Sequence, residues 1–145
     1  MILPPLELDL VVPLPPERAF ALFADLDAWW PKARFSVFED DAASCAIEPA
    51  VGGAVYEISR AGERSEWGRV VAWEPPRRFA MTWHPGRARS EAQQVEVVFH
   101  ESGGGTRVVL RHFGWEALGD DAAALRERYA HGWIAVIDQY KEKAR

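Results

Sequence analysis

The sequence has one cysteine, three lysines, no asparagine and no long apolar run. The single Cys45 excludes an internal disulfide and any zinc site built from several cysteines. No apolar run approaches the ~20 residues that a membrane-spanning helix needs. The first residues lack the basic start and apolar stretch of a signal peptide, which predicts a cytoplasmic protein. The net charge is −5, so we expect no basic surface for nucleic acid or anionic lipid.

What is present is the composition of one folded domain. The chain has 145 residues, of which 48% are hydrophobic and 27% charged, and this balance is globular rather than disordered. We expect a single domain over residues 1–145, with no cofactor and no metal. Seven tryptophans are many for this length. Because a buried indole N–H needs a partner, tryptophan-rich domains often use these rings to line a pocket or an interface.

The hydrophobic pattern predicts helices near both ends of the chain and strands between them. Residues 6–12 alternate as a half-buried strand. Pro15 and Pro16 open a helix, and Asp27 caps a second short turn that carries Trp29 and Trp30. Further strands are predicted at residues 35–38, 44–48, 54–60, 66–73, 78–84, 94–100 and 106–113. A long helix over residues 119–143 has one apolar face, formed by Leu125, Tyr129, Trp133, Val136 and Tyr140.

This order predicts an α+β fold. About six consecutive antiparallel strands pair as a curved sheet that wraps around the long C-terminal helix, with two short helices after the first strand. Such a sheet and helix splay apart unless bulky side chains fill the space, so we expect a cavity between them. Its mouth is predicted near Trp29, Trp30 and residues 113–115.

Several segments resemble the START-like SRPBCC superfamily, in the order seen there. They are residues 48–53 (EPAVGG), 66–70 (EWGRV), 73–78 (WEPPRR), 82–83 (TW), 105–108 (GTRV), 112–115 (HFGW) and 132–133 (GW). The chain is most similar to the branch named after the activator of heat-shock-protein-90 ATPase, from about Leu6 to Tyr140. The resemblance implies the helix-grip fold of the birch pollen allergen. The eukaryotic activator also has a separate N-terminal domain that this chain lacks, so the family name does not carry over as a function.

The aromatic residues and their inward-facing neighbours are the candidate ligand-binding set. Alternatively, the same rings simply form the core. The predicted lining is Trp29, Trp30, Trp67, Met81, Trp83, Val97, Phe99, Leu110, His112, Trp115, Tyr129 and Trp133. Trp73 shares strand parity with Arg69 and is expected to point outward, unless a bulge reverses it.

Two polar residues are candidate acid–base groups. His112 follows Val108 and Leu110 at period two and should face inward, either as a ligand anchor or general base, or as a core histidine satisfied by its neighbours. Glu57 shares parity with Val55. It either points inward as a proton-transfer group or lies in solvent on the opposite face.

The other histidines and Cys45 suggest no chemistry. His84, His100 and His131 have no metal-ligand spacing, and Cys45 is expected to be buried and inert. Gly132 inside a helix predicts a close approach of that helix backbone to another group.

The sequence is compatible with three functions. The first is a small-molecule binding protein for an apolar, aromatic or lipid-like ligand. The second, implied by the resemblance, is a cyclase or dehydratase that uses His112 and Glu57. The third is an interaction module, either a chaperone regulator or a homodimer joined through exposed tryptophans.

Overall fold

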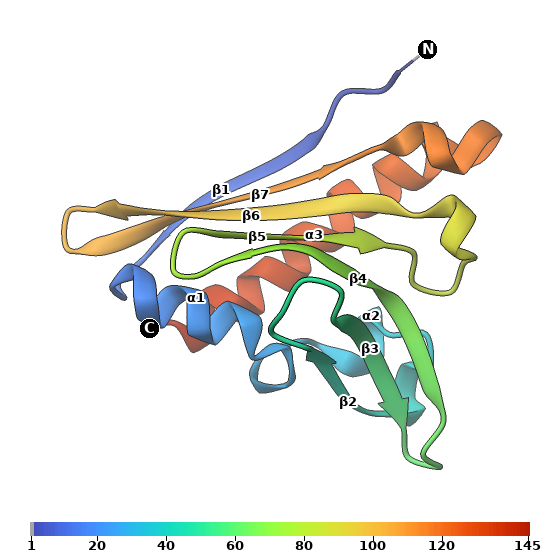
Figure 1. The fold of residues 1–145 in the computed structure, drawn as a ribbon, viewed down its shortest axis with the longest axis horizontal. Coiled ribbons are helices and arrows are strands. Elements are labelled where there is room, and N and C mark those ends of the chain that lie inside the picture. Colours follow the sequence, from blue (N-terminus) through green and yellow to red (C-terminus); the bar gives the residue numbers. More distant parts are fainter. Residues whose placement is uncertain (1) are drawn as a thin grey trace.

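The computed structural model describes residues 2–145, which form a curled antiparallel sheet with helices against its concave face (Figure 1). The strands are β1 (Leu6–Val12), β2 (Ala42–Ile47), β3 (Ala54–Ser59), β4 (Arg64–Glu74), β5 (Arg78–Trp83), β6 (Gln93–Ser102) and β7 (Gly105–Phe113). The helices are α1 (Pro16–Ala24), α2 (Lys32–Phe35) and α3 (Ala122–Lys143). Short 3-10 helices are η1 (Leu26–Ala28), η2 (Glu39–Asp41), η3 (Arg89–Glu91) and η4 (Trp115–Asp121).

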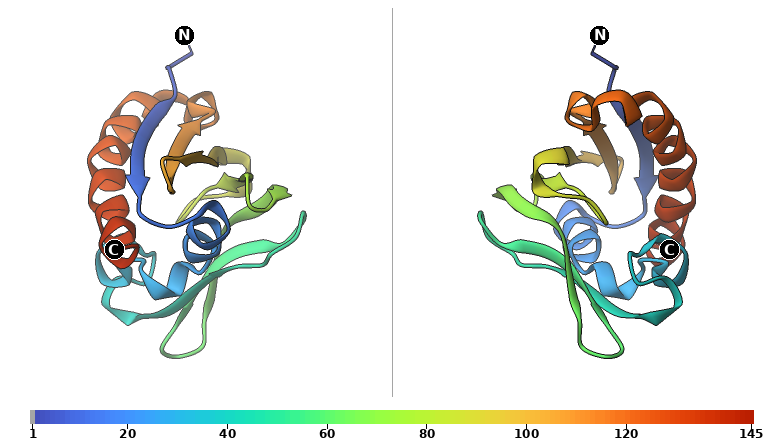
Figure 2. Two further views of the ribbon diagram at one scale, coloured as in Figure 1. Left: turned by 90° about the vertical axis from the view of Figure 1, so that its left-hand side faces the viewer. Right: turned by 90° about the vertical axis from the view of Figure 1, so that its right-hand side faces the viewer.

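The seven strands pair antiparallel in the order β1-β7-β6-β5-β4-β3-β2. All strands except β1 therefore pair with their neighbours in sequence, and β1 closes the sheet against β7. Figure 2 shows the sheet curling around the space that α1 and α3 occupy. The predicted helix-grip architecture is confirmed.

Two predicted elements differ from those observed. Residues 35–38 do not form a strand, because the backbone N–H groups of Val37 and Phe38 donate to the Glu57 carboxylate (2.6 and 3.1 Å) instead of to a neighbouring strand. The long helix begins at Ala122 rather than at Gly119, whose φ of 57° and ψ of −129° are not helical.

Asp27 lies inside η1 and does not cap it. Its carboxylate accepts a hydrogen bond from the Cys45 backbone N–H (3.2 Å) at the outer edge of β2, and it pairs with Lys32 (3.0 Å). A carboxylate at this position satisfies an N–H group of an edge strand that would otherwise be open to pairing.

Strand β4 contains two extra residues that change which side chains face inward. Trp67 is extra relative to β3, and Val71 is extra relative to β5. Because the second bulge shifts the parity by one, Trp73 lies opposite the buried Phe79 and packs against Phe20 (ring centroids 5.2 Å apart). The bulge that would reverse the outward orientation is therefore present, and Trp73 points inward.

Candidate ligand-binding site

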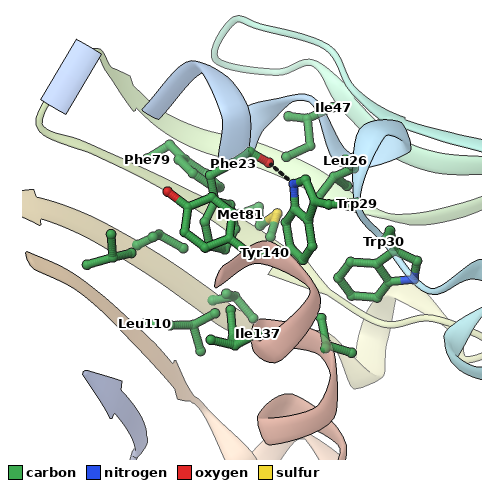
Figure 3. Close-up of a cluster of buried hydrophobic side chains, with 14 of the residues drawn as sticks. Phe23, Leu26, Trp29, Trp30, Ile47, Phe79, Met81, Leu110, Ile137 and Tyr140 are labelled. Carbon is green, nitrogen blue, oxygen red and sulfur yellow. Dashed lines mark hydrogen bonds between the residues drawn. The ribbon is translucent and has the colours of Figure 1, made fainter. Parts of the chain in front are cut away.

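Side chains of a mixed aromatic and aliphatic core fill much of the space between the sheet and α3 (Figure 3). Phe20 and Phe23 of α1 and Trp29 after η1 reach into the concave face, where Phe23 packs against Tyr140 with ring centroids 4.8 Å apart. The predicted lining residues in this filled region belong to the buried core: Trp29, Trp67, Met81, Val97, Phe99 and Leu110. They do not line the open cleft, because α1 and η1 supply enough bulk to close that part of the interior.

An open cleft of about 800 Å³ remains along α3, facing α2 and the loop after β5. Its wall on α3 extends from Leu125 to Val136, and the opposite wall comprises residues 34–37 and 85–87. Four predicted lining residues lie in it: Trp30, Trp83, Tyr129 and Trp133. This volume lies within the range of ligand-binding sites.

Three tryptophans meet at the base of the cleft. The Trp83 ring lies 5.4 Å from that of Trp133 and 6.0 Å from that of Trp30, centroid to centroid. The indole N–H of Trp30 donates to the Phe35 carbonyl (3.0 Å), and that of Trp133 donates to His112 Nδ1 (2.9 Å). The Trp83 Nε1–H, by contrast, is buried without a hydrogen-bond partner. An unpaired buried donor is costly, and the Tyr129 hydroxyl beside it is the acceptor that the protein itself offers.

Other polar groups surround these indoles. The Ser36 hydroxyl is also buried without a partner. Burial raises the pKa of the Tyr129 hydroxyl, while the nearby Trp83 indole and the charges of Arg87 and Arg128 act in the opposite direction. The phenol therefore stays protonated and can donate or accept a hydrogen bond in the cleft.

His112 lies behind the cleft rather than in its lining. Its Nδ1 accepts the Trp133 hydrogen bond, so its Nε2–H donates to Gln93 Oε1 (3.1 Å). Its ring stacks on Trp115 with centroids 4.1 Å apart, and this contact fills the end where the cavity mouth was predicted near residues 113–115. Burial lowers the pKa of His112 to about 3. The side chain is a neutral imidazole with both nitrogens occupied, which leaves none free for a ligand.

Glu57 points inward and is fully buried, which resolves the two orientations that its sequence position left open. Its carboxylate accepts the Trp67 indole N–H (2.6 Å) as well as the Val37 and Phe38 backbone N–H groups. Through these three hydrogen bonds, the carboxylate holds the Ser36–Val37 wall of the cleft against β3 and β4. It does not line the cleft itself.

Gly132 lies where α3 passes the ring of Phe35. A Cβ atom at this position would be 3.4 Å from Phe35 Cε1, which is a tight contact. The predicted close approach is therefore one between α3 and α2, and it narrows the cleft at this point.

The sequence reading missed the rim of the cleft. The residues it missed are Arg34, Phe35, Ser36, Val37, Pro85, Gly86, Arg87, Leu125, Arg128, His131, Gly132, Ala135 and Val136. Of those on α3, Leu125 and Val136 belong to the predicted apolar face but were not predicted to line the cavity. The others lie beside that face, so widening it by one helical step would have included Arg128 and Gly132. Nothing in the sequence pattern links residues 34–37 or 85–87 to α3.

A second, smaller recess of about 420 Å³ lies beside Trp29, Lys32 and Lys143. Within residues 2–145, no group of three or more His, Cys, Asp or Glu side chains is placed to hold a metal ion. Six tryptophans are buried and Trp73 is half-buried, so no exposed tryptophan is available for a dimer contact. None of the helices over the same residues has the length and hydropathy to cross a membrane.

The curled sheet that wraps around the long C-terminal helix defines the class of fold: a START-like helix-grip domain. Within that class, the chain belongs to the family described as Activator of Hsp90 ATPase homolog 1-like protein, whose model matches residues 13–143. The resemblance read from the sequence is confirmed.

Solved structures agree with this assignment. The chain is similar to an anthrahydroquino-gamma-pyrone synthase, Txn09, complexed with SUM, at 34% identity over 86% of each chain and a TM-score of 0.60. Bacillus halodurans protein BH1534 matches over the full length of both chains, at 20% identity and a TM-score of 0.71. Nitrosomonas europaea protein NE0264 matches at 17% identity over 95% of this chain and 92% of that one, with a TM-score of 0.69. The last two show the fold alone. No curated protein matches the chain.

Proposed function

We propose that this protein binds a flat, largely apolar small molecule in the cleft between α3 and residues 34–37. The observation that carries the proposal is the cluster of Trp30, Trp83 and Trp133 at the base of an open space of about 800 Å³, with the Trp83 N–H unpaired. Aromatic faces favour planar ligands by stacking, and a few directed polar groups fix their orientation. A flat aromatic molecule fits this geometry better than a flexible lipid chain does.

A second candidate, a cyclase-type enzyme, is supported by the 34% identity to the anthrahydroquino-gamma-pyrone synthase. His112 and Glu57 are poorly placed for this role, because neither lines the cleft and their polar atoms are already hydrogen-bonded. Tyr129 is the better candidate for a proton donor to a substrate carbonyl, because its side chain lines the cleft. With a polycyclic hydroquinone substrate, an enzyme would lose turnover in Tyr129→Phe while keeping substrate affinity, whereas a simple binding protein would show no product in either form.

The binding proposal is tested with N-phenyl-1-naphthylamine, a neutral aromatic dye whose fluorescence rises in apolar surroundings. Gly132→Leu places a branched side chain against Phe35 and should obstruct the cleft. We expect dye affinity to fall by about ten-fold, the equivalent of ~1.4 kcal/mol.

Ala124→Leu is the matched control, since it adds a similar side chain at an exposed position of the same helix outside the cleft. The control should keep wild-type affinity. If a folded Gly132→Leu protein binds the dye as the wild type does, the cleft is not the binding site. The cytoplasmic location and a homodimer stay predictions from the sequence.

A further inference from the structure

The cleft is positively charged although the protein is acidic. Its lining includes Arg34, Arg87 and Arg128, and none of the lining residues described is an aspartate or a glutamate. The whole chain carries a net charge of −5. A concave site lined by one sign of charge concentrates counter-ions of the opposite sign, so the local field at the cleft favours anions.

Two of these arginines have no carboxylate partner. Arg87 donates to Glu91 (2.6 Å) and lies 3.7 Å from Asp121, so its charge is largely neutralised within the protein. Among residues 2–145, Arg34 and Arg128 form no ion pair. The Arg34 guanidinium lies 5.1 Å from the centre of the Phe35 ring in the cleft wall. Their donors are therefore free for an incoming anion.

The unpaired neutral groups add to this preference. The Trp83 indole can only donate a hydrogen bond, and it is 2% exposed and makes none, although the Tyr129 hydroxyl lies beside it. The Ser36 hydroxyl also lacks a partner. The cleft thus offers unpaired donors both at its base and at its rim, and it offers no carboxylate to receive a donor from the ligand.

We infer that the ligand is an aromatic anion: a planar ring system that carries a carboxylate or another anionic oxygen group. The ring lies against Trp30, Trp83 and Trp133, a carbonyl or hydroxyl oxygen accepts the Trp83 N–H, and the anionic group lies between Arg34 and Arg128. This inference rests on the proposed function, because it specifies the ligand of the same cleft.

The test compares two dyes that differ by one charged group. N-phenyl-1-naphthylamine is neutral, and 1-anilinonaphthalene-8-sulfonate is the same ring system with a sulfonate. We expect the wild-type protein to bind the sulfonate about five-fold more tightly than the neutral dye, as expected for ion pairs at a partly exposed rim. Raising the salt concentration should reduce this ratio, because salt screens the charge interaction.

The double variant Arg34→Gln/Arg128→Gln should bring the affinity ratio close to one. Lys141→Gln is the control: it removes the same sign of charge from an exposed position of α3 outside the cleft, and it should keep the wild-type ratio. A ratio near one in the wild type, or a ratio that the double variant leaves unchanged, overturns the anion inference while the neutral dye still supports the cleft as a binding site. Failure of both dyes to bind overturns the proposed function and this inference with it.

Discussion

At the scale of single residues, the buried side chain of His112 stabilises the fold through hydrogen bonds and does not line the cleft. It accepts one hydrogen bond from Trp133 and donates one to Gln93, so the neutral tautomer is fully satisfied. Burial holds its pKa at about 3, well below the ordinary 6.5. A protonated imidazole would present a second N–H to the Trp133 donor. The histidine therefore links β7 to α3 only while it is uncharged.

This linkage makes stability depend on pH in a defined direction. Unfolded His112 takes up a proton below pH 6.5, and the folded side chain does not until about pH 3. Its contribution is therefore complete above pH 6.5 and is lost as the pH falls toward 3, by at most about 1.4 kcal/mol per pH unit. Urea unfolding between pH 7 and pH 4 should show a shallower slope for His112→Gln than for the wild type. The exposed His100→Gln variant should keep the wild-type slope, and equal slopes in all three proteins would contradict the assignment.

At the scale of elements, strand β4 depends on a backbone contact that only glycine allows. Next to the Trp67 bulge, a Cβ on Gly68 would lie 1.8 Å from the Thr82 carbonyl oxygen of β5. The Trp67 carbonyl accepts the His84 N–H (2.6 Å) at the same place. The bulge thus turns the Trp67 indole inward toward Glu57 while keeping β4 and β5 close together.

Gly68→Ala should therefore destabilise the protein severely, by more than about 3 kcal/mol, because the obstructing atom belongs to the backbone of the next strand. Gly132→Ala adds the same methyl group against the movable Phe35 ring, and in a helix it gains up to about 1 kcal/mol of propensity. Thermal unfolding of both variants measures the contrast. Equal melting temperatures would mean that the β4–β5 contact is not close.

The wall of the cleft is a second element-scale feature, because it depends on a single carboxylate. In Glu57→Gln the amide keeps one acceptor oxygen, which can still serve Val37 and Trp67, and turns its N–H₂ group toward the Phe38 N–H donor. We expect a loss of about 1–3 kcal/mol in unfolding free energy and weaker dye binding, since residues 36–38 lose their anchor. The exposed Glu63→Gln variant serves as the control in chemical denaturation and dye titration. If Glu57→Gln behaves like the wild type in both measurements, Glu57 does not anchor the cleft wall.

At the scale of the whole molecule, the interior is filled at one end and open at the other. Near the C-terminus of α3, Tyr140 contacts Phe23 and Trp29, and its hydroxyl donates to the Ala19 carbonyl (2.8 Å). This bond joins the last helix to the first across 121 residues of sequence. Nearer the middle of α3, where no α1 side chain reaches, the cleft remains open.

Tyr140→Phe should lower the unfolding free energy by about 1–3 kcal/mol, because the buried Ala19 carbonyl loses its side-chain donor while the ring packing stays. Tyr56→Phe is the comparison, since Tyr56 is only half-buried and its ring lies 3.8 Å from the Arg64 guanidinium. Dye affinity should be unchanged in Tyr140→Phe, because the residue lies outside the cleft. A stability equal to that of Tyr56→Phe would mean that the hydroxyl contributes nothing.

Local patterns predicted most of the elements and part of the site. The spacing of Trp133, Val136 and Tyr140 places them on one helix face, and all three are buried. The same spacing could not separate Trp83, which lines the cleft, from Trp67, which is sealed behind it. That difference depends on how much of the concave face the side chains of α1 and η1 cover, and only the tertiary packing sets this.

The amino-acid order alone determined the α+β arrangement of this protein, because strand alternation, helical periodicity and turn residues act over short stretches of chain. The family resemblance of its motifs implied the helix-grip fold. Tertiary structure alone decided where the interior stays open and what charge it carries. Arg34 and Arg128 are far apart in sequence, and only the packing of α2 beside α3 brings both to one cleft. The parity of Trp73 was likewise set by one extra residue in β4, whose position depends on its pairing with β5.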